Sequence, residues 1–180
     1  MIRSVLLLCI LVLAGCDFKE REKATSAKSE FVETELAPAD SLGIPVYKFD
    51  ELEPLLNKKD DKIYIINFWA TWCAPCIKEL PYFEKINQEG EAHNWKVILV
   101  SLDMPSMWKT KLIPFIKNKN LKAEVVVLDD PDQNSWIPKI DKDWSGAIPA
   151  TLIYSRNKRK FYEQTFTYDM LNKELQEFQN

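Results

Sequence analysis

The segment that most constrains the fold of this chain is a strand pattern that runs directly into a pair of closely spaced cysteines. Residues 63–68 read Ile-Tyr-Ile-Ile-Asn-Phe, a β-branched and aromatic run typical of a buried strand. Cys73 and Cys76 follow, and an apolar helical pattern begins at Cys73 and extends to Gly90. The sequence therefore predicts a strand, a loop and a helix, with both cysteines at the helix N-terminus.

Strand and helix patterns alternate along the rest of the chain. The predicted strands are 44–49, 97–101, 125–128, 151–154 and 161–164, and the predicted helices are 50–57, 106–120 and 168–178. Asp50 is the expected cap of the first helix, and Pro114 weakens the helical pattern around it. The last two strands flank a basic turn and favour an antiparallel hairpin. This order predicts an α/β fold with a central mixed sheet flanked by helices.

A few apolar residues are expected to pack in the core of this fold. They are Leu52, Leu55, Leu56, Trp69, Leu80, Phe83 and Ile86. Residues 129–145 are read as a polar insertion, in which Trp136, Ile137 and Ile140 are the candidates for packing. His93 is expected to be structural or solvated, and Lys158-Arg159-Lys160 to form the solvated face of the hairpin turn.

The N-terminus has the pattern of a targeting signal. Arg3 precedes an apolar run of about ten residues, which is shorter than the roughly 20 that span a bilayer as a helix. Leu13-Ala14-Gly15-Cys16 resembles the bacterial lipobox, which implies cleavage before Cys16 and acylation of its thiol. We expect a lipoprotein signal peptide at 1–15, a lipidated cysteine and flexible tether at 16–40, and a domain at 41–180. The alternative is an ordinary signal peptide in which Cys16 has no role.

The cysteine count narrows the chemistry of the domain. The chain has four cysteines and one histidine; Cys9 lies in the signal and Cys16 is the lipidation candidate, which leaves Cys73 and Cys76. A zinc site needs about four ligands, and covalent haem attachment needs a histidine where Ile77 stands. We therefore expect no metal and no cofactor. The formal net charge of −3 argues against nucleic acid as a partner.

The position of the cysteine pair suits redox chemistry. Free N–H groups and the helix dipole at the helix N-terminus favour a negative charge, so we expect the pKa of the Cys73 thiol to be lowered. Cys76 lies one turn further along, close enough to form a disulfide with Cys73. Pro75 is compatible with the first helical turn, where its missing N–H would be unpaired. A purely structural disulfide would close a very short loop and constrain little, so the spacing favours a dithiol that cycles with its disulfide.

The motif from Phe68 to Cys76, Phe-Trp-Ala-Thr-Trp-Cys-Ala-Pro-Cys, resembles the active site of the thioredoxin superfamily. The expected membrane-anchored, extracytoplasmic setting narrows the resemblance, which covers residues 42–180, to the TlpA/ResA-like branch. It implies a thioredoxin fold, a three-layer sandwich around a mixed sheet. It also implies a thiol-disulfide oxidoreductase in which Cys73 attacks and Cys76 resolves.

Further residues take their expected roles from this resemblance. Ile148-Pro149 matches the loop whose cis-proline faces the disulfide and leaves the backbone at Ile148 open to a partner chain; the alternative is an ordinary trans loop. Glu79 matches a glutamate that exchanges a proton with Cys76; the alternative is a solvated glutamate in the first helical turn. Asn67 departs from the aspartate of cytosolic thioredoxins and argues against that type.

The resemblance also implies the partners. We expect reduction of disulfide-containing envelope proteins, with apocytochrome c as one candidate, on the extracytoplasmic side of the cell envelope. Electrons would come from a membrane-embedded thiol donor, because the sequence has no nicotinamide or flavin motif. Trp72 is either part of the docking surface or a half-exposed apolar shield. We expect a monomer anchored to the membrane by its lipid. The alternatives are a disulfide oxidase or isomerase, a peroxidase of the same fold, and a non-enzymatic binding module.

Overall fold

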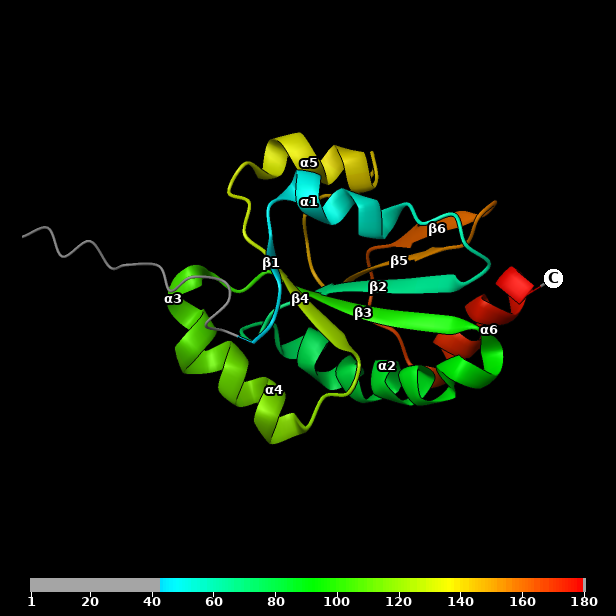
Figure 1. Ribbon diagram of the computed structural model, residues 1–180, viewed down its shortest axis with the longest axis horizontal. Coiled ribbons are helices and arrows are strands. Elements are labelled where there is room, and N and C mark those ends of the chain that lie inside the picture. Colours follow the sequence, from blue (N-terminus) through cyan, green and yellow to red (C-terminus); the bar gives the residue numbers. More distant parts are fainter. Residues whose placement is uncertain (1–42, 180) are drawn as a thin grey trace, which may run out of the picture. The chain divides into compact units, whose positions relative to one another are not determined.

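The computed structural model describes residues 43–179, which form a six-stranded mixed sheet with helices on both faces (Figure 1). The strand order is β1-β4-β3-β2-β5-β6. The strands are β1 (Val46–Tyr47), β2 (Ile63–Trp69), β3 (Trp95–Ser101), β4 (Glu124–Leu128), β5 (Ala150–Tyr154) and β6 (Arg159–Tyr162). The signal peptide, Cys9, Cys16 and the tether predicted from the sequence lie outside the described residues.

The sheet is parallel on one side of β2 and antiparallel on the other. Strands β1, β4, β3 and β2 pair in parallel, whereas β5 pairs antiparallel with both β2 and β6. The mixed sheet expected from the sequence is therefore confirmed. Strand β2 lies between β3 and β5 in the sheet. Its C-terminal end leads to the cysteines and lies beside the C-terminal end of β3 and the first residue of β5.

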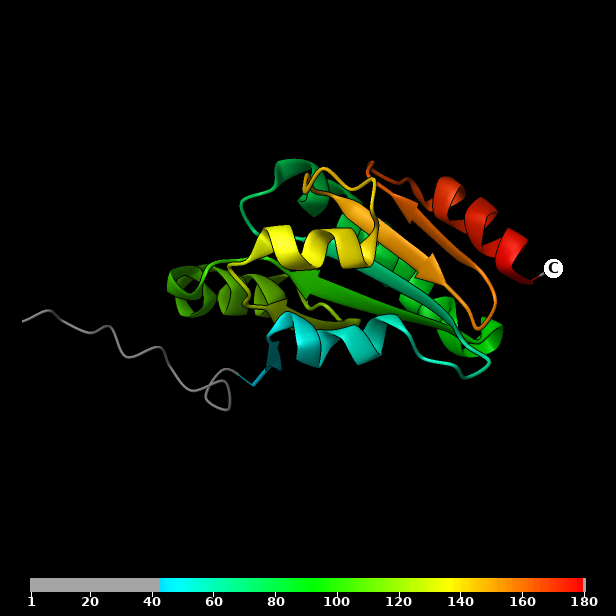
Figure 2. The same cartoon turned by 90° about the horizontal axis from the view of Figure 1, so that it is seen from above.

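Two groups of helices cover the two faces of the sheet. On one face lie α1 (Phe49–Leu52), the 3-10 helix η2 (Glu53–Leu56) and α5 (Gln133–Ile140), the face seen in Figure 2. On the other face lie α2 (Ala74–His93), α4 (Ile113–Lys119) and α6 (Tyr168–Gln179) (Figure 1). A short helix α3 (Pro105–Met107) and a π-helical segment η3 (Trp108–Leu112) precede α4. These three layers form the predicted sandwich.

The alternation of side chains along β2 divides the core into two parts. Ile65 packs with residues of α2 and α6, whereas Ile66 and Phe68 pack with residues of α1 and α5. All seven residues of β2 are buried, because helices cover both faces of the strand. The predicted core residues Leu52, Leu56, Trp69, Leu80, Phe83 and Ile86 are each at most 2% exposed. Leu55 is only partly buried.

The first strand and helix differ from their predicted bounds. Strand β1 ends at Tyr47, and Phe49 already belongs to α1, where its ring stacks on Trp136 at a centroid distance of 6.1 Å. The cap position is Lys48 rather than Asp50. The Lys48 backbone N–H donates to the Glu51 carboxylate at 2.8 Å, so Glu51 satisfies this end of the helix. The predicted cap at Asp50 was therefore wrong.

The predicted helix 106–120 is helical without interruption from Pro105 to Lys119, but it contains a π-helical turn. The π-helical turn Trp108–Leu112 lies immediately before α4, and Pro114 lies in the first turn of α4. Proline has no N–H for the regular helical bond to the preceding turn, and a wider turn accommodates that loss. The predicted position of the helix is therefore confirmed, and the π-helical turn lies just before the proline that weakens the helical pattern.

The segment 129–145 contains a helix that the sequence did not predict. Helix α5 buries Trp136 and Ile140 against the sheet, and Trp144 follows at 5% exposure. The Trp136 indole N–H donates to the Asp130 carbonyl at 3.0 Å. Because α5 has only eight residues and contains Pro138, its stability depends on these tertiary contacts, which local sequence does not reveal.

The basic hairpin is tied to the rest of the domain rather than only solvated. Strand β6 begins at Arg159, earlier than predicted, and the Arg159 guanidinium donates to the carbonyls of Leu56 and Ile140. Lys160 forms ion pairs with Glu174 and Glu177 of α6. The expected solvated cluster therefore links the hairpin to the helices around it. His93 is exposed at the end of α2 and stacks on Trp95, in agreement with a structural or solvated role.

Candidate active site

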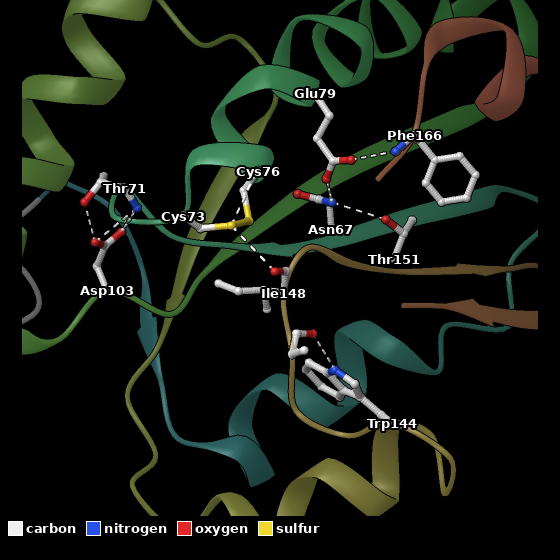
Figure 3. The surroundings of a disulfide bond; sticks show 11 residues. Asn67, Thr71, Cys73, Cys76, Glu79, Asp103, Trp144, Ile148, Thr151 and Phe166 are labelled. Atoms are coloured by element: carbon white, nitrogen blue, oxygen red, sulfur yellow. Dashed lines mark hydrogen bonds between the residues drawn. A yellow bond between two sulfur atoms is a disulfide. The ribbon is translucent and has the colours of Figure 1, made fainter. Parts of the chain in front are cut away.

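The two cysteines form a disulfide at the N-terminus of α2. Cys73 is the N-cap residue of this helix, and its Sγ accepts the backbone N–H of Cys76 at 3.3 Å (Figure 3). The Cys73 side chain is 5% exposed and Cys76 is fully buried. Cys73 Sγ thus accepts a backbone N–H of the first helical turn, and such a position favours a thiolate once the disulfide is reduced.

A buried aspartate holds the loop between β2 and the cysteines. The Asp103 carboxylate accepts hydrogen bonds from the Thr71 N–H at 3.0 Å, the Thr71 hydroxyl at 2.5 Å and the Ser101 hydroxyl at 2.9 Å. Asp103 is 2% exposed. Sequence reasoning missed this residue, although an aspartate just after a buried strand at the cysteine end of the sheet was a usable signal.

The loop before β5 closes the other side of the disulfide. The Ile148–Pro149 peptide bond is cis, and the Ile148 carbonyl oxygen lies 3.7 Å from Cys73 Sγ. The Trp144 indole N–H donates to the Ala147 carbonyl at 2.8 Å, which holds this loop against α5 and the sheet. The structure therefore brings Ile148 and Pro149 to the cysteines, as the resemblance implied.

Glu79 is buried and hydrogen-bonded, not solvated. It is 2% exposed; one carboxylate oxygen accepts from Asn67 Nδ2 at 2.9 Å and the other from the Phe166 N–H at 2.7 Å. Burial raises the pKa of Glu79 to about 7, although both hydrogen bonds act in the opposite direction. The alternative of a solvated glutamate is therefore wrong. Neither of these two hydrogen bonds reaches Cys76, which lies one turn earlier on α2.

Asn67 connects Glu79 to the adjacent strand. It pairs with Thr151 in the register of β2 and β5, and Asn67 Nδ2 donates to Thr151 Oγ1 at 3.2 Å. Within residues 43–179, the Asn67 Oδ1 atom has no hydrogen-bond partner and is buried. Figure 3 shows that the Asn67 and Glu79 side chains point toward each other below the start of α2.

Two large apolar side chains are exposed at or next to the loops of the site. Trp72, directly before Cys73, is 55% exposed, and Met104, directly after Asp103, is 60% exposed. This partial exposure of Trp72 is compatible with both interpretations from the sequence, a docking surface and an apolar shield. Met104 was not singled out from the sequence.

Residues 43–179 contain no group of three or more His, Cys, Asp or Glu side chains placed to hold a metal ion. No helix in that range is both long and apolar enough to cross a bilayer.

Comparison with known proteins places this site in a family. The sequence profile of the AhpC/TSA family matches residues 51–159, more than half of the chain. The thiol-disulfide oxidoreductase ResA of Geobacillus thermodenitrificans is 24% identical over 97% of this chain and 92% of its own. ResA of Halalkalibacterium halodurans is 33% identical over 57% of this chain and 53% of its own.

Solved structures agree on the fold. A thiol:disulfide interchange protein of the thioredoxin family from Chlorobium tepidum superposes with a TM-score of 0.53 and 18% identity, over 65% of this chain and 79% of its own. The chain spans only 22%, 28% and 56% of the length of three other curated relatives that it matches. The chain therefore belongs to the AhpC/TSA family, with a thioredoxin fold and a similarity to ResA along nearly its whole length.

Proposed function

We propose that this protein is a thiol-disulfide oxidoreductase that reduces disulfides in partner proteins. The observation that carries the proposal is the cysteine pair at the N-terminus of α2, with Cys73 Sγ under the first helical turn and beside the Ile148 carbonyl. The curated relatives named ResA support the same class of activity.

The reaction begins with the reduced protein, in which Cys73 is a thiolate and Cys76 a thiol. Cys73 attacks one sulfur of the partner's disulfide, that disulfide breaks, and its other sulfur leaves as a thiolate. The product of this step is a mixed disulfide between Cys73 and the partner.

Cys76 completes the reaction. Its proton passes to Glu79, the Cys76 thiolate attacks Cys73 Sγ, and the second partner sulfur leaves as a thiolate. Two electrons move from the dithiol to the partner; the two partner thiolates take one proton that originated on Cys76 and one from solvent. A buried carboxyl with a pKa of about 7 suits this transfer, because it can hold or release a proton near neutral pH.

The partner would bind across the loops around the disulfide. Cys73 is only 5% exposed, so an attacking geometry requires a partner chain that reaches between Trp72 and the loop of Ile148 and Pro149. An extended partner segment can pair with the open backbone at Ile148 in the manner of an added strand.

We propose a setting for this reaction on the basis of the sequence. The lipobox-like segment ending at Cys16 supports a lipid anchor on the extracytoplasmic side of the cell envelope. There the protein would act as a monomer on disulfide-containing envelope proteins, with apocytochrome c as one candidate. A membrane-embedded thiol donor would reduce the disulfide again after each turnover.

Insulin reduction with dithiothreitol as the electron source tests the activity. Wild-type protein should accelerate the precipitation of the insulin B chain, and the Cys73→Ser protein should leave the rate at the dithiothreitol background. Equal acceleration by the two proteins would exclude the proposed chemistry. The reduction potential then decides the direction: a value clearly below that of glutathione supports a reductase, and a value near or above it supports net oxidation or isomerisation.

A further inference from the structure

Strand β2 is apolar or aromatic except at Asn67, the fifth of its seven residues, which is fully buried. A buried amide oxygen without a hydrogen-bond partner destabilises a fold, and Asn67 Oδ1 is such an atom within residues 43–179. An apolar residue of similar size would avoid that cost. The amide nitrogen is the part of the side chain that makes contacts, because it donates to both Glu79 and Thr151.

We propose that Asn67 is a positioning residue for Glu79: its amide N–H fixes one carboxylate oxygen of Glu79 and favours the ionised form that accepts the proton of Cys76. The inference deepens the proposed function and rests on it for the catalytic consequence. Asn67 does not touch the sulfur atoms in this account. It acts only through Glu79.

The orientation of the amide follows from its neighbours. Asn67 Nδ2 has two acceptors within reach, Glu79 Oε1 at 2.9 Å and Thr151 Oγ1 at 3.2 Å, so both of its hydrogens are used. The reverse orientation would place the amide oxygen against an ionised carboxylate. Thr151, fixed opposite Asn67 by the strand register, therefore holds the amide with its donors toward Glu79.

Both hydrogen-bond donors to the Glu79 carboxylate are neutral groups. From the segment between β6 and α6, the Phe166 N–H donates to the second carboxylate oxygen, and Cys76, half of the disulfide, lies one turn earlier on α2. Tyr162 of β6 packs edge-on against the Phe166 ring but directs its hydroxyl to Glu174 of α6, which is also paired with Lys160. Asn67 is thus the one side-chain donor in the described structure that hydrogen-bonds the Glu79 carboxylate.

The titration of Glu79 in the oxidised protein tests the inference without any turnover. Carbon-13 NMR of the glutamate carboxyl groups, assigned with Glu79→Gln, gives the midpoint of Glu79 directly. Loss of a hydrogen bond to a charged group should raise that midpoint by about one pH unit or more in Asn67→Leu. Thr151→Val is the matched control: it removes one contact of the amide but leaves the bond to Glu79, so its midpoint should rise by less than half as much.

A second readout follows the reaction. In Asn67→Leu, the pH at which the partner is released from the mixed disulfide at half the maximal rate should rise together with the Glu79 midpoint. A folded Asn67→Leu protein with an unchanged Glu79 midpoint would overturn the inference. So would a Thr151→Val protein with the same shift as Asn67→Leu, because the effect would then come from disturbed packing between β2 and β5.

A further measurement covers the case in which Asn67→Leu does not fold. The side-chain NH2 signals of Asn67 in the wild-type protein should titrate with the midpoint of Glu79 and should stop titrating in Glu79→Gln. Signals that do not follow Glu79 would overturn the inference. Failure of the insulin assay would instead remove the proposed function and leave the coupling of Asn67 to Glu79 standing.

Discussion

At the scale of single residues, the chemistry depends on polar groups that the fold buries. The sequence predicted Cys73 and Cys76 from their spacing and their place after a strand, which is local information. It could not predict that Glu79 is buried, because the covering Phe166 lies 87 residues further along the chain. The position of Asp103 after a buried strand was a usable signal, but its contact with Thr71 was not predictable because the two residues belong to different loops.

The burial of Glu79 predicts a specific dependence of stability on pH. Below the ordinary pKa of 4.5 the carboxyl is protonated in both states; between 4.5 and about 7 only the folded protein keeps the proton. The contribution of Glu79 to the free energy of unfolding should therefore fall as the pH rises through this range. The total change is on the order of 3 kcal/mol.

Urea unfolding of the wild-type and Glu79→Gln proteins at a series of pH values measures the pH-dependent contribution of Glu79 to the free energy of unfolding. From pH 4.5 to 7, the wild-type protein should lose stability relative to the Glu79→Gln protein. Above pH 7, the difference in unfolding free energy between the two proteins should stay constant. A difference that is constant across the range would show that Glu79 titrates normally in the folded protein.

The hydrogen bonds of the Asp103 carboxylate predict a large loss of stability when this side chain is truncated. Asp103→Ala removes the acceptor of three hydrogen bonds and leaves their donors unpaired beside the cysteine loop. We expect a loss of about 2 to 4 kcal/mol in the free energy of unfolding, measured with urea. Asp143→Ala is the control, because that side chain is 82% exposed and its ion pair with Lys142 is long at 3.9 Å. Equal effects of the two substitutions would contradict the role given to Asp103.

At the scale of elements, the long buried strands and helix α2 were predictable, whereas the short elements were not. Strand β2 and helix α2 each carry a continuous pattern that specifies them locally. Helix α5 forms because Trp136 and Ile140 pack on the sheet, and the π-helical turn forms because Pro114 follows it. Such elements depend on contacts or backbone constraints that a periodic pattern does not record.

The packing of α2 against β3 predicts that one glycine-to-alanine substitution within the helix lowers the stability of the protein. Alanine normally stabilises a helix interior relative to glycine by about 0.5–1 kcal/mol. A Cβ at Gly90 would lie 2.7 Å from the Trp95 carbonyl oxygen, which belongs to the backbone. Gly90→Ala should therefore destabilise the protein by about 1 to 3 kcal/mol in thermal or urea unfolding. The exposed neighbour Gln88→Ala should have an effect near zero, and a stabilising Gly90→Ala would contradict the close approach.

At the scale of the whole molecule, the layered fold gathers three separate segments at one end of the sheet. The loop after β2 brings the cysteines, the segment after β3 brings Asp103, and the loop before β5 brings Ile148 (Figure 3). The alternation of strands and helices predicted the sandwich and its mixed sheet. It did not predict that the hairpin would be tied to α6 through Lys160, because that contact depends on the relative placement of two finished elements.

The central claim is that Cys73 attacks a partner's disulfide and Cys76 resolves the product. The most direct test is to mix reduced Cys76→Ser protein with oxidised insulin and analyse the product on a non-reducing gel and by mass spectrometry. We predict a stable mixed disulfide that joins insulin to Cys73, whereas reduced Cys73→Ser should form little or none under the same conditions. No adduct with Cys76→Ser, or an equal adduct through Cys76 in Cys73→Ser, would contradict the account.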